Sequence, residues 1–271
     1  MMWHGMEENM TQVRVFLGAV VLALIVCCWS PAKTAAQEIG ESARVAEDLD
    51  VVRLSGRVYM HVSRYEMPPF GLVPANGLIL VDKGEAFLFD TPWTESQTEV
   101  LLDWIENVLH ARVTACVPNH WHKDAMGGLP AVRRRGIPTY AYDGTIAIAR
   151  QKGLRPPEHG FASERTLKLH GLEVRNVYLG GGHSTDGIFV WIPAENLLFP
   201  GCMAKDAKTV NLGNTEDADV RAWPGTMEKA LAAFPDARIV VPGHGQPGGP
   251  ELLRHTRDLA LRADHDRAIP D

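Results

Sequence analysis

The sequence predicts an α/β (α+β) domain made of two similar halves, with sheets packed inside and helices outside. The first observation is the order of elements, because strands, a helix and a further strand follow one another twice along residues 37–271. The second is size, since 271 residues, of which 45% are apolar, can bury a sizeable core. The third is continuity: no low-complexity linker divides residues 37–271, and we expect one domain there.

In the first half, strands precede a capped helix. Residues 51–62 predict two short strands, and residues 77–81 and 86–89 predict a hairpin. Thr94 and Gln97 form the pattern of a capping box that begins a helix. The apolar residues that follow at helical spacing are Val100, Leu101, Trp104, Ile105, Val108 and Leu109. The elements expected next are a buried strand at 113–117, a short helix from Gly127 and an extended segment at 137–142.

The second half has the same style. The strands expected there are 167–169, 172–179, 188–192 and 197–199, followed by a helix at 223–234 and a strand at 238–241. A closing helix is expected at 250–263, where Pro250 suits the first turn.

The N-terminal segment predicts export. Residues 15–28 are uniformly apolar and uncharged, Arg14 precedes them, and small residues at 34–36 suit cleavage by signal peptidase. We therefore expect residues 1–36 to be a signal peptide and the mature chain to begin near Gln37 in the periplasm. The apolar stretch is shorter than a membrane span requires, so no stable membrane anchor is expected.

Three alternatives concern the same segment. The signal could stay uncleaved as an anchor. Cys27 could carry a lipid, although the bulky Val26 stands where a lipobox has a small residue. Because Glu7 and Glu8 are unusual in a signal peptide, translation could also start at Met10.

Charge and cysteine usage narrow the function classes. The net charge is −6 and no extended segment rich in lysine and arginine occurs, which argues against a nucleic-acid partner. Cys116 lies in an apolar run and is expected to be a small buried strand residue. Cys202 follows an apolar run at a predicted strand end, where functional groups are common. A disulfide between these two cysteines is the alternative in an exported protein.

The segment Asn119-His-Trp-His-Lys-Asp124 carries the clearest chemical signal. If the chain after the predicted strand is extended, alternate side chains point the same way, and His120, His122 and Asp124 converge. Imidazole and carboxylate groups are good zinc ligands. The alternative for this motif alone is a pair of surface histidines at a strand end.

Three further candidate ligands also follow predicted strands. His183 stands in a glycine-rich segment, Cys202 comes after Pro200-Gly201, and His244 lies in Pro242-Gly-His-Gly. Together with the first motif this makes six candidate ligands, which is too many for one tetrahedral zinc. They suit two zinc ions with three protein ligands each and open positions for water.

These motifs resemble those of the subclass B1 metallo-β-lactamases, a class B β-lactamase family. The matching segments are residues 119–128, 182–186, 201–214 and 241–249, and the C-terminal motif resembles the Verona-type carbapenemases. The resemblance implies a four-layer αββα sandwich, the metallo-β-lactamase fold, with a two-zinc groove at one sheet edge. The ligands it implies are His120, His122 and His183 for the first zinc, and Asp124, Cys202 and His244 for the second.

The resemblance also implies residues that act on a substrate. Lys205 would pair with the substrate carboxylate, and Asn214 would help to polarise the lactam carbonyl. Asp124 and Asn214 are the expected catalytic residues. The alternatives are a solvated surface lysine for Lys205 and a simple turn for Asn214.

Two neighbouring segments complete the expected site. Residues 63–76 hold apolar residues in what we interpret as an irregular stretch between strands, and Tyr65 and Phe70 would close over the substrate as part of a flexible hairpin. Ordinary packing is the alternative for them. Asp90 resembles an acid beneath the metal site that orients ligands. Ala125 departs from the family pattern, which often has arginine after the aspartate.

The function implied is hydrolysis of β-lactam antibiotics, including penicillins, cephalosporins and carbapenems, with antibiotic resistance as the result. A hydroxide generated on zinc would attack the lactam carbonyl without a covalent enzyme intermediate. A monomer is expected. The first rival is another hydrolase of this fold, a lactonase, thioesterase or nuclease, and the second is a zinc-binding protein without catalysis. Cys202, Lys205 and Ala125, which stands where related hydrolases have histidine, argue against the first rival. The second rival should have lost a ligand or the lysine, and this sequence keeps all of them.

Overall fold

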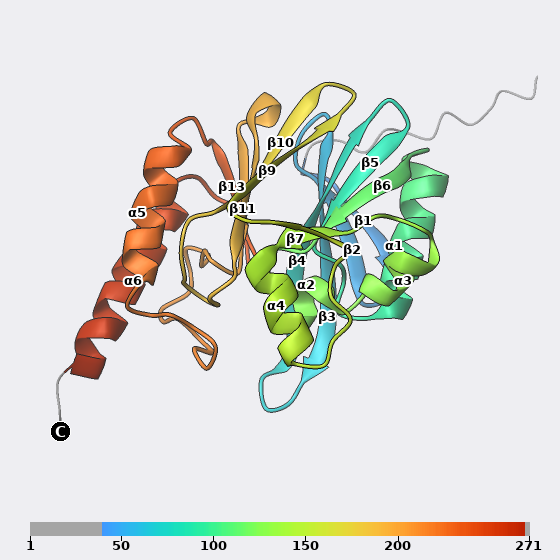
Figure 1. Cartoon of the computed structure of the whole chain (residues 1–271). Coiled ribbons are helices and arrows are strands. Elements are labelled where there is room, and N and C mark those ends of the chain that lie inside the picture. Colours follow the sequence, from blue (N-terminus) through green and yellow to red (C-terminus); the bar gives the residue numbers. More distant parts are fainter. Residues whose placement is uncertain (1–39, 269–271) are drawn as a thin grey trace, which may run out of the picture. The chain divides into compact units, whose positions relative to one another are not determined.

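The computed structural model describes residues 40–268 of the chain (Figure 1). The predicted signal peptide, and with it the question of Cys27 and Met10, lies outside the described residues. Within 40–268, no helix combines the length and the apolar character needed to cross a membrane.

The first half forms a six-stranded sheet with the strands in sequence order. The strands are β1 (Ser42–Ala46), β2 (Leu49–Arg53), β3 (Val58–Met67), β4 (Gly71–Asp82), β5 (Glu85–Phe89) and β6 (Arg112–Val117). The first five pair antiparallel, and β6 pairs parallel to β5 after the crossover helix α1 (Glu95–Val108). β1 was not expected from the sequence.

The second half forms a five-stranded sheet in the order β13-β12-β11-β10-β9. Its strands are β9 (Glu164–Leu169), β10 (Leu172–Tyr178), β11 (Ile188–Ile192), β12 (Leu197–Gly201) and β13 (Ile239–Pro242). Here too an antiparallel run ends in a crossover helix, α5 (Trp223–Ala233), and a parallel strand, β13. This repetition confirms the two similar halves, and α6 (Glu251–Ala268) closes the chain.

The elements between the sheets are short. They are α2 (Lys123–Met126), α3 (Leu129–Arg134), β7 (Tyr140–Tyr142), α4 (Asp143–Gln151), β8 (His159–Phe161) and the 3-10 helix η1 (Pro193–Glu195). α4 and β8 were not expected, whereas α3 and β7 lie within segments for which a short helix and an extended chain were expected.

Three layers of apolar packing hold the domain together. Leu78 and Leu80 of β4 face the core between the two sheets, whereas Ile79 between them faces α1. On the far side, Trp223 of α5 and Leu253 of α6 pack against the outer face of the second sheet. Figure 1 shows α1 and α3 on one side of the paired sheets and α5 and α6 on the other. The αββα sandwich predicted from the resemblance is therefore confirmed.

The stretch 63–76 was interpreted as irregular, but it belongs to a regular β-hairpin, which agrees with the hairpin that the resemblance implied. β3 and β4 pair without interruption from Val58 opposite Leu80 to Met67 opposite Gly71. Pro68 and Pro69 lie in the connecting turn, and of the three prolines only Pro74 lies in the ladder.

Helix α1 begins where the capping box predicted. Thr94 accepts a hydrogen bond from the Gln97 backbone N–H, and the Gln97 side chain accepts one from the Thr94 backbone N–H. Val100 and Val108 have the predicted helical spacing but are 39% exposed, because the helix rests on Leu101, Leu102 and Ile105.

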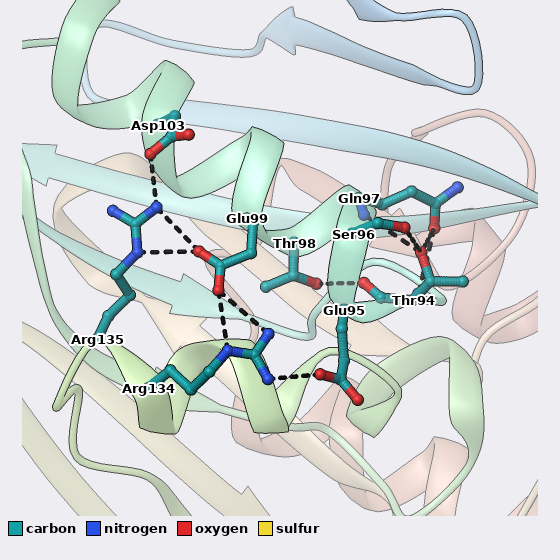
Figure 2. Close-up of polar contacts among 9 residues, drawn as sticks. All are labelled: Thr94, Glu95, Ser96, Gln97, Thr98, Glu99, Asp103, Arg134 and Arg135. Carbon is teal, nitrogen blue, oxygen red and sulfur yellow. Dashed lines mark hydrogen bonds and ion pairs between the residues drawn. The ribbon is translucent and has the colours of Figure 1, made fainter.

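Exposed ion pairs then attach α1 to α3, as Figure 2 shows together with the capping box. Arg134 contacts Glu95 at 2.6 Å and Glu99 at 3.1 Å, and Arg135 contacts Glu99 at 2.9 Å and Asp103 at 2.6 Å. Because these five charges form a network, they can contribute to the stability of the fold, whereas a single exposed ion pair would add almost nothing to it.

The substitution Thr94→Ala should lower the free energy of unfolding by about 1 kcal/mol, because it removes the acceptor for the first turn of α1. Urea denaturation of the metal-free protein measures this change. The neighbouring exposed Ser96→Ala, which leaves the capping box in place, is the control and should have a smaller effect. An equal loss in both variants would contradict the capping role of Thr94.

Candidate metal centre

The predicted ligands lie in loops at strand ends. His120 and His122 follow β6, Cys202 follows β12 and His244 follows β13, while His183 lies in the loop between β10 and β11. β5 with β6, and β12 with β13, are parallel pairs. Their carboxyl ends therefore point the same way in each sheet, which places the following loops at one edge.

Asp124 joins the site for a different reason from the one predicted. The chain is not extended through Asp124, because α2 begins at Lys123 and His122 is its N-cap residue. The backbone N–H groups of Ala125 and Met126 donate to the His122 carbonyl. This turn brings Asp124 Oδ1 to 3.5 Å from His120 Nε2, so convergence depends on a helical turn rather than on strand alternation.

Three histidines form the first candidate ligand group. The ring centroids of His120, His122 and His183 lie 4.7 to 5.3 Å apart, and the rings meet edge to face. Nδ1 of His122 lies 3.1 Å from Nε2 of His183. One nitrogen from each of the three rings falls within 4.8 Å of the others, which is a spacing that one metal ion can bridge.

Asp124 is the centre of the second candidate group. Its Oδ2 lies 3.2 Å from Cys202 Sγ and 3.2 Å from His244 Nε2. A nitrogen of His120, an oxygen of Asp124 and the sulfur of Cys202 also fall within 4.8 Å of one another. All six predicted ligands therefore come together.

The protonation states of these groups fit a cation. His120 is 1% exposed, and neither ring nitrogen has a hydrogen-bond partner among the described residues. Burial lowers the pKa of His120 to about 3, so its imidazole is neutral and has a free lone pair. Burial would raise the pKa of Asp124, but His120, His244 and His122 hold that pKa well below its usual range.

Cys202 responds in the opposite direction. Burial, and then the charge of Asp124, raise the pKa of the Cys202 thiol well above its usual range. A metal ion that binds this sulfur must therefore displace a proton. Neutral imidazole, carboxylate and thiolate are together the donor set of zinc, and the buried nitrogens of His120 fit such an ion.

His122 is oriented by a residue that the sequence did not indicate. Its Nε2 lies 3.0 Å from Asp217 Oδ2, which leaves Nδ1 directed at the ligand group. Asp217 belongs to the loop between β12 and α5, and Lys152 Nζ lies 3.7 Å from its Oδ1. The same Nζ lies 4.3 Å from the ring centroid of Trp121.

Asp90 supports the first motif through the backbone. Its Oδ1 accepts a hydrogen bond from the Asn119 N–H, directly before His120. Asp90 has a φ of 56°, in the left-handed region. Burial raises the pKa of its carboxyl.

Lys205 lies close to the ligands, whereas Asn214 is on the surface. Burial lowers the pKa of Lys205, and Cys202 and Asp124 act against that shift. Its Nζ lies 5.4 Å from the ring centroid of Trp223. Asn214 is exposed, and its Oδ1 accepts a hydrogen bond from the Glu216 N–H at 3.0 Å. Its side chain forms the turn that the sequence left open as an alternative.

The two hairpin residues occupy different places. Tyr65 in β3 stacks on Trp93 with centroids 5.5 Å apart, and Lys123 Nζ lies 3.8 Å from the Tyr65 ring centroid. Phe70 lies in the turn between β3 and β4 and is 62% exposed. Of these two residues, only Phe70 is largely exposed.

Cys116 and Cys202 are both free, which overturns the disulfide alternative. Cys116 is buried in β6, as predicted. Ala125 is fully buried, and its carbonyl accepts hydrogen bonds from the N–H and Oγ1 of Thr91.

Comparison with known proteins supports the same interpretation. The metallo-beta-lactamase superfamily model matches residues 70–244. A metallo-beta-lactamase type 2 of Bacteroides fragilis is 48% identical over 219 residues, which cover 81% of this chain and 88% of that protein. One from Bacillus cereus is 34% identical over 213 residues, which cover 78% and 82% of the two chains.

Solved structures agree in fold. A metallo-beta-lactamase from Pontibacter korlensis superposes with a TM-score of 0.76 at 38% identity, covering 79% of this chain and 99% of that chain. VMB-1 superposes with a TM-score of 0.77 at 38% identity, covering 81% and 99%.

The substitution Asp217→Asn should weaken zinc binding at the three-histidine group by about tenfold, because it removes the charge that holds the His122 ring. Competition with a chromophoric chelator measures the affinity. Glu216→Gln removes an exposed charge from the same loop and should leave the affinity unchanged. Wild-type affinity in Asp217→Asn would show that His122 needs no such support.

Proposed function

Because the chain belongs to the metallo-β-lactamase superfamily, we propose that it is a zinc-dependent hydrolase that opens the ring of β-lactam antibiotics. The observation that carries this proposal is the convergence of six zinc-type donors, one of them the thiol of Cys202, beside Lys205. Its relatives are themselves named metallo-β-lactamases.

The donor set supports two zinc ions per chain. His120, His122 and His183 would hold the first, and Asp124, Cys202 and His244 would hold the second. Six donors exceed the four positions of one tetrahedral zinc, and three protein donors per ion leave open positions, as catalytic sites do. When bound, zinc makes water a nucleophile near neutral pH and acts as a Lewis acid.

The residues of the chain have separate tasks around the reacting bond. Asp124 stays ionised and can accept a hydrogen bond from the attacking water, which is its proposed catalytic part. Asn214 would donate to the lactam carbonyl through Nδ2, while its Oδ1 accepts the hydrogen bond from the Glu216 N–H. No serine or cysteine nucleophile is required, since water attacks directly and the thiol of Cys202 is a ligand.

Two features favour a β-lactam over other substrates. Lys205 supplies a positive charge near the ligands, which suits the carboxylate of bicyclic β-lactams. Phe70 and Leu72, 62% and 61% exposed, form an apolar hairpin tip that would cover the antibiotic. Penicillins, cephalosporins and carbapenems share this carboxylate, and we propose all three as substrates.

The proposal extends to the setting of the enzyme. A periplasmic location agrees with the predicted signal peptide, and the lack of a nucleic-acid partner agrees with the net charge of −6. We propose a monomer. The rival hydrolases, a lactonase or thioesterase, would need no cation for a substrate carboxylate. Their further histidine after the aspartate is replaced by Ala125, which is buried.

The purified mature chain should hydrolyse a carbapenem, with loss of the lactam ultraviolet absorbance. EDTA should abolish the reaction and added zinc should restore it. The reason is that imidazoles, a carboxylate and a thiol are zinc donors, so activity should depend on bound zinc. Benzylpenicillin, a lactone and a thioester are assayed in parallel. A folded, zinc-loaded protein that cleaves the lactone or thioester but neither antibiotic would overturn the proposed function.

The substitution Lys205→Met should raise KM for the carbapenem roughly 10- to 150-fold, since a hydrogen bond to a charged group contributes about 1.5–3 kcal/mol. Steady-state kinetics at saturating zinc measure this change. Lys208→Met, an exposed lysine in the same loop, should leave KM unchanged. Equal KM values for the two variants would exclude Lys205 from substrate binding.

A further inference from the structure

Asn76 of β4 is bound to the loop that carries His244. Its Nδ2 donates to the carbonyls of Pro242 and Gly245, at 2.9 Å each. Its backbone N–H donates to the Gly243 carbonyl at 2.8 Å. One residue of the first sheet thus makes three hydrogen bonds to the four-residue segment around His244.

The loop around His244 is a tight turn packed against Cys202. Gly245 has a φ of 84°, and a Cβ at Gly243 would lie 2.4 Å from Cys202 Sγ. The chain therefore turns sharply against Cys202, with its carbonyls directed at Asn76. Asn76 is 3% exposed, so water cannot readily replace its two amide hydrogens as donors.

The same strand sets the orientation of the His244 ring. Nδ1 of His244 lies 2.6 Å from the carbonyl of Pro74, two residues before Asn76. A carbonyl only accepts, so Nδ1 carries the hydrogen and Nε2 keeps its lone pair. That Nε2 lies 3.2 Å from Asp124 Oδ2, within the second ligand group.

We propose that Asn76 is a positioning residue for the second zinc: it holds the 242–245 loop so that Pro74 can fix the His244 ring with Nε2 toward Asp124. The inference rests on the proposed two-zinc site. Asn76 is not one of the six candidate ligands and would act through His244. Asn76 belongs to the first half of the fold and His244 to the second, so the hydrogen bonds of Asn76 also connect the two halves.

The chain contains a matched control for this role. Asn176 of β10 is 1% exposed, and its Nδ2 also donates to a backbone carbonyl, that of Arg165, at 3.1 Å. That bond lies between β10 and β9 and carries no ligand. Asn176→Ala therefore removes a buried asparagine and its hydrogen bonding without touching the ligand loop.

The test compares Asn76→Ala with Asn176→Ala in the mature chain. Zinc affinities are measured by chelator competition, which resolves two binding events. Cobalt substitution follows the sulfur-to-metal charge-transfer band of Cys202. In Asn76→Ala the affinity for the second metal should fall about tenfold or more. A correspondingly higher cobalt concentration should be required before the charge-transfer band appears. The first binding event should not change, and Asn176→Ala should keep both affinities.

Several results would overturn the inference. They are wild-type affinity for the second metal in Asn76→Ala, or equal losses at both metals, or the same loss in Asn176→Ala. If Asn76→Ala does not fold, Asn76→Ser replaces it in the test, because serine keeps one short hydrogen-bond donor. Its affinity for the second metal should fall by a smaller factor, and its affinity for the first metal should not change. Wild-type affinity for the second metal in Asn76→Ser would also overturn the inference. These measurements need no antibiotic. If the wild-type chain binds two metals but does not hydrolyse β-lactams, that result would contradict the proposed function and not the role of Asn76.

Discussion

The Asp124 carboxylate is the group around which the rest of the site is arranged. It is 8% exposed and ionised, yet no lysine or arginine forms an ion pair with it among residues 40–268. An isolated carboxylate in that position would be expensive to bury. Its neighbours within 3.5 Å are the Nε2 atoms of His120 and His244 and the sulfur of Cys202, and each of these residues is itself a candidate ligand. The structure thus assembles negative charge and neutral lone pairs in one place, and a divalent cation would compensate them.

This arrangement needs both halves of the molecule. His120, His122 and Asp124 follow β6, whereas Cys202 and His244 follow β12 and β13. Hydrogen bonds cross between the halves at two places, from Asn76 to the His244 loop and from His122 Nε2 to Asp217. A metal ion held by both sets would add to the packing between the sheets. Zinc binding and domain stability should therefore be coupled, because the native state alone offers the complete donor set.

The sequence could predict the ligands but not the contacts that orient them. The histidines, the cysteine and the aspartate were recognisable because they lie after apolar strands. The αββα layers were predicted from the family resemblance, and in the structure the faces alternate accordingly at Leu78, Ile79 and Leu80. Asp124 was included for an incorrect reason, since α2 begins one residue before it. Asp217 and Asn76 carry no local signal. Their partners lie 95 and 166 residues away in the chain, and only the packing of the two sheets brings them together.

The placement of Lys205 connects metal binding to substrate choice. Burial disfavours its charge, whereas Cys202 and Asp124 act in its favour. A metal ion bound by these two groups would offset their support of the ammonium group. A substrate carboxylate would then supply a negative charge beside Lys205. The same electrostatics would bind a neutral lactone or thioester poorly. The charge arrangement around Cys202 therefore supports the proposed preference for an anionic bicyclic lactam.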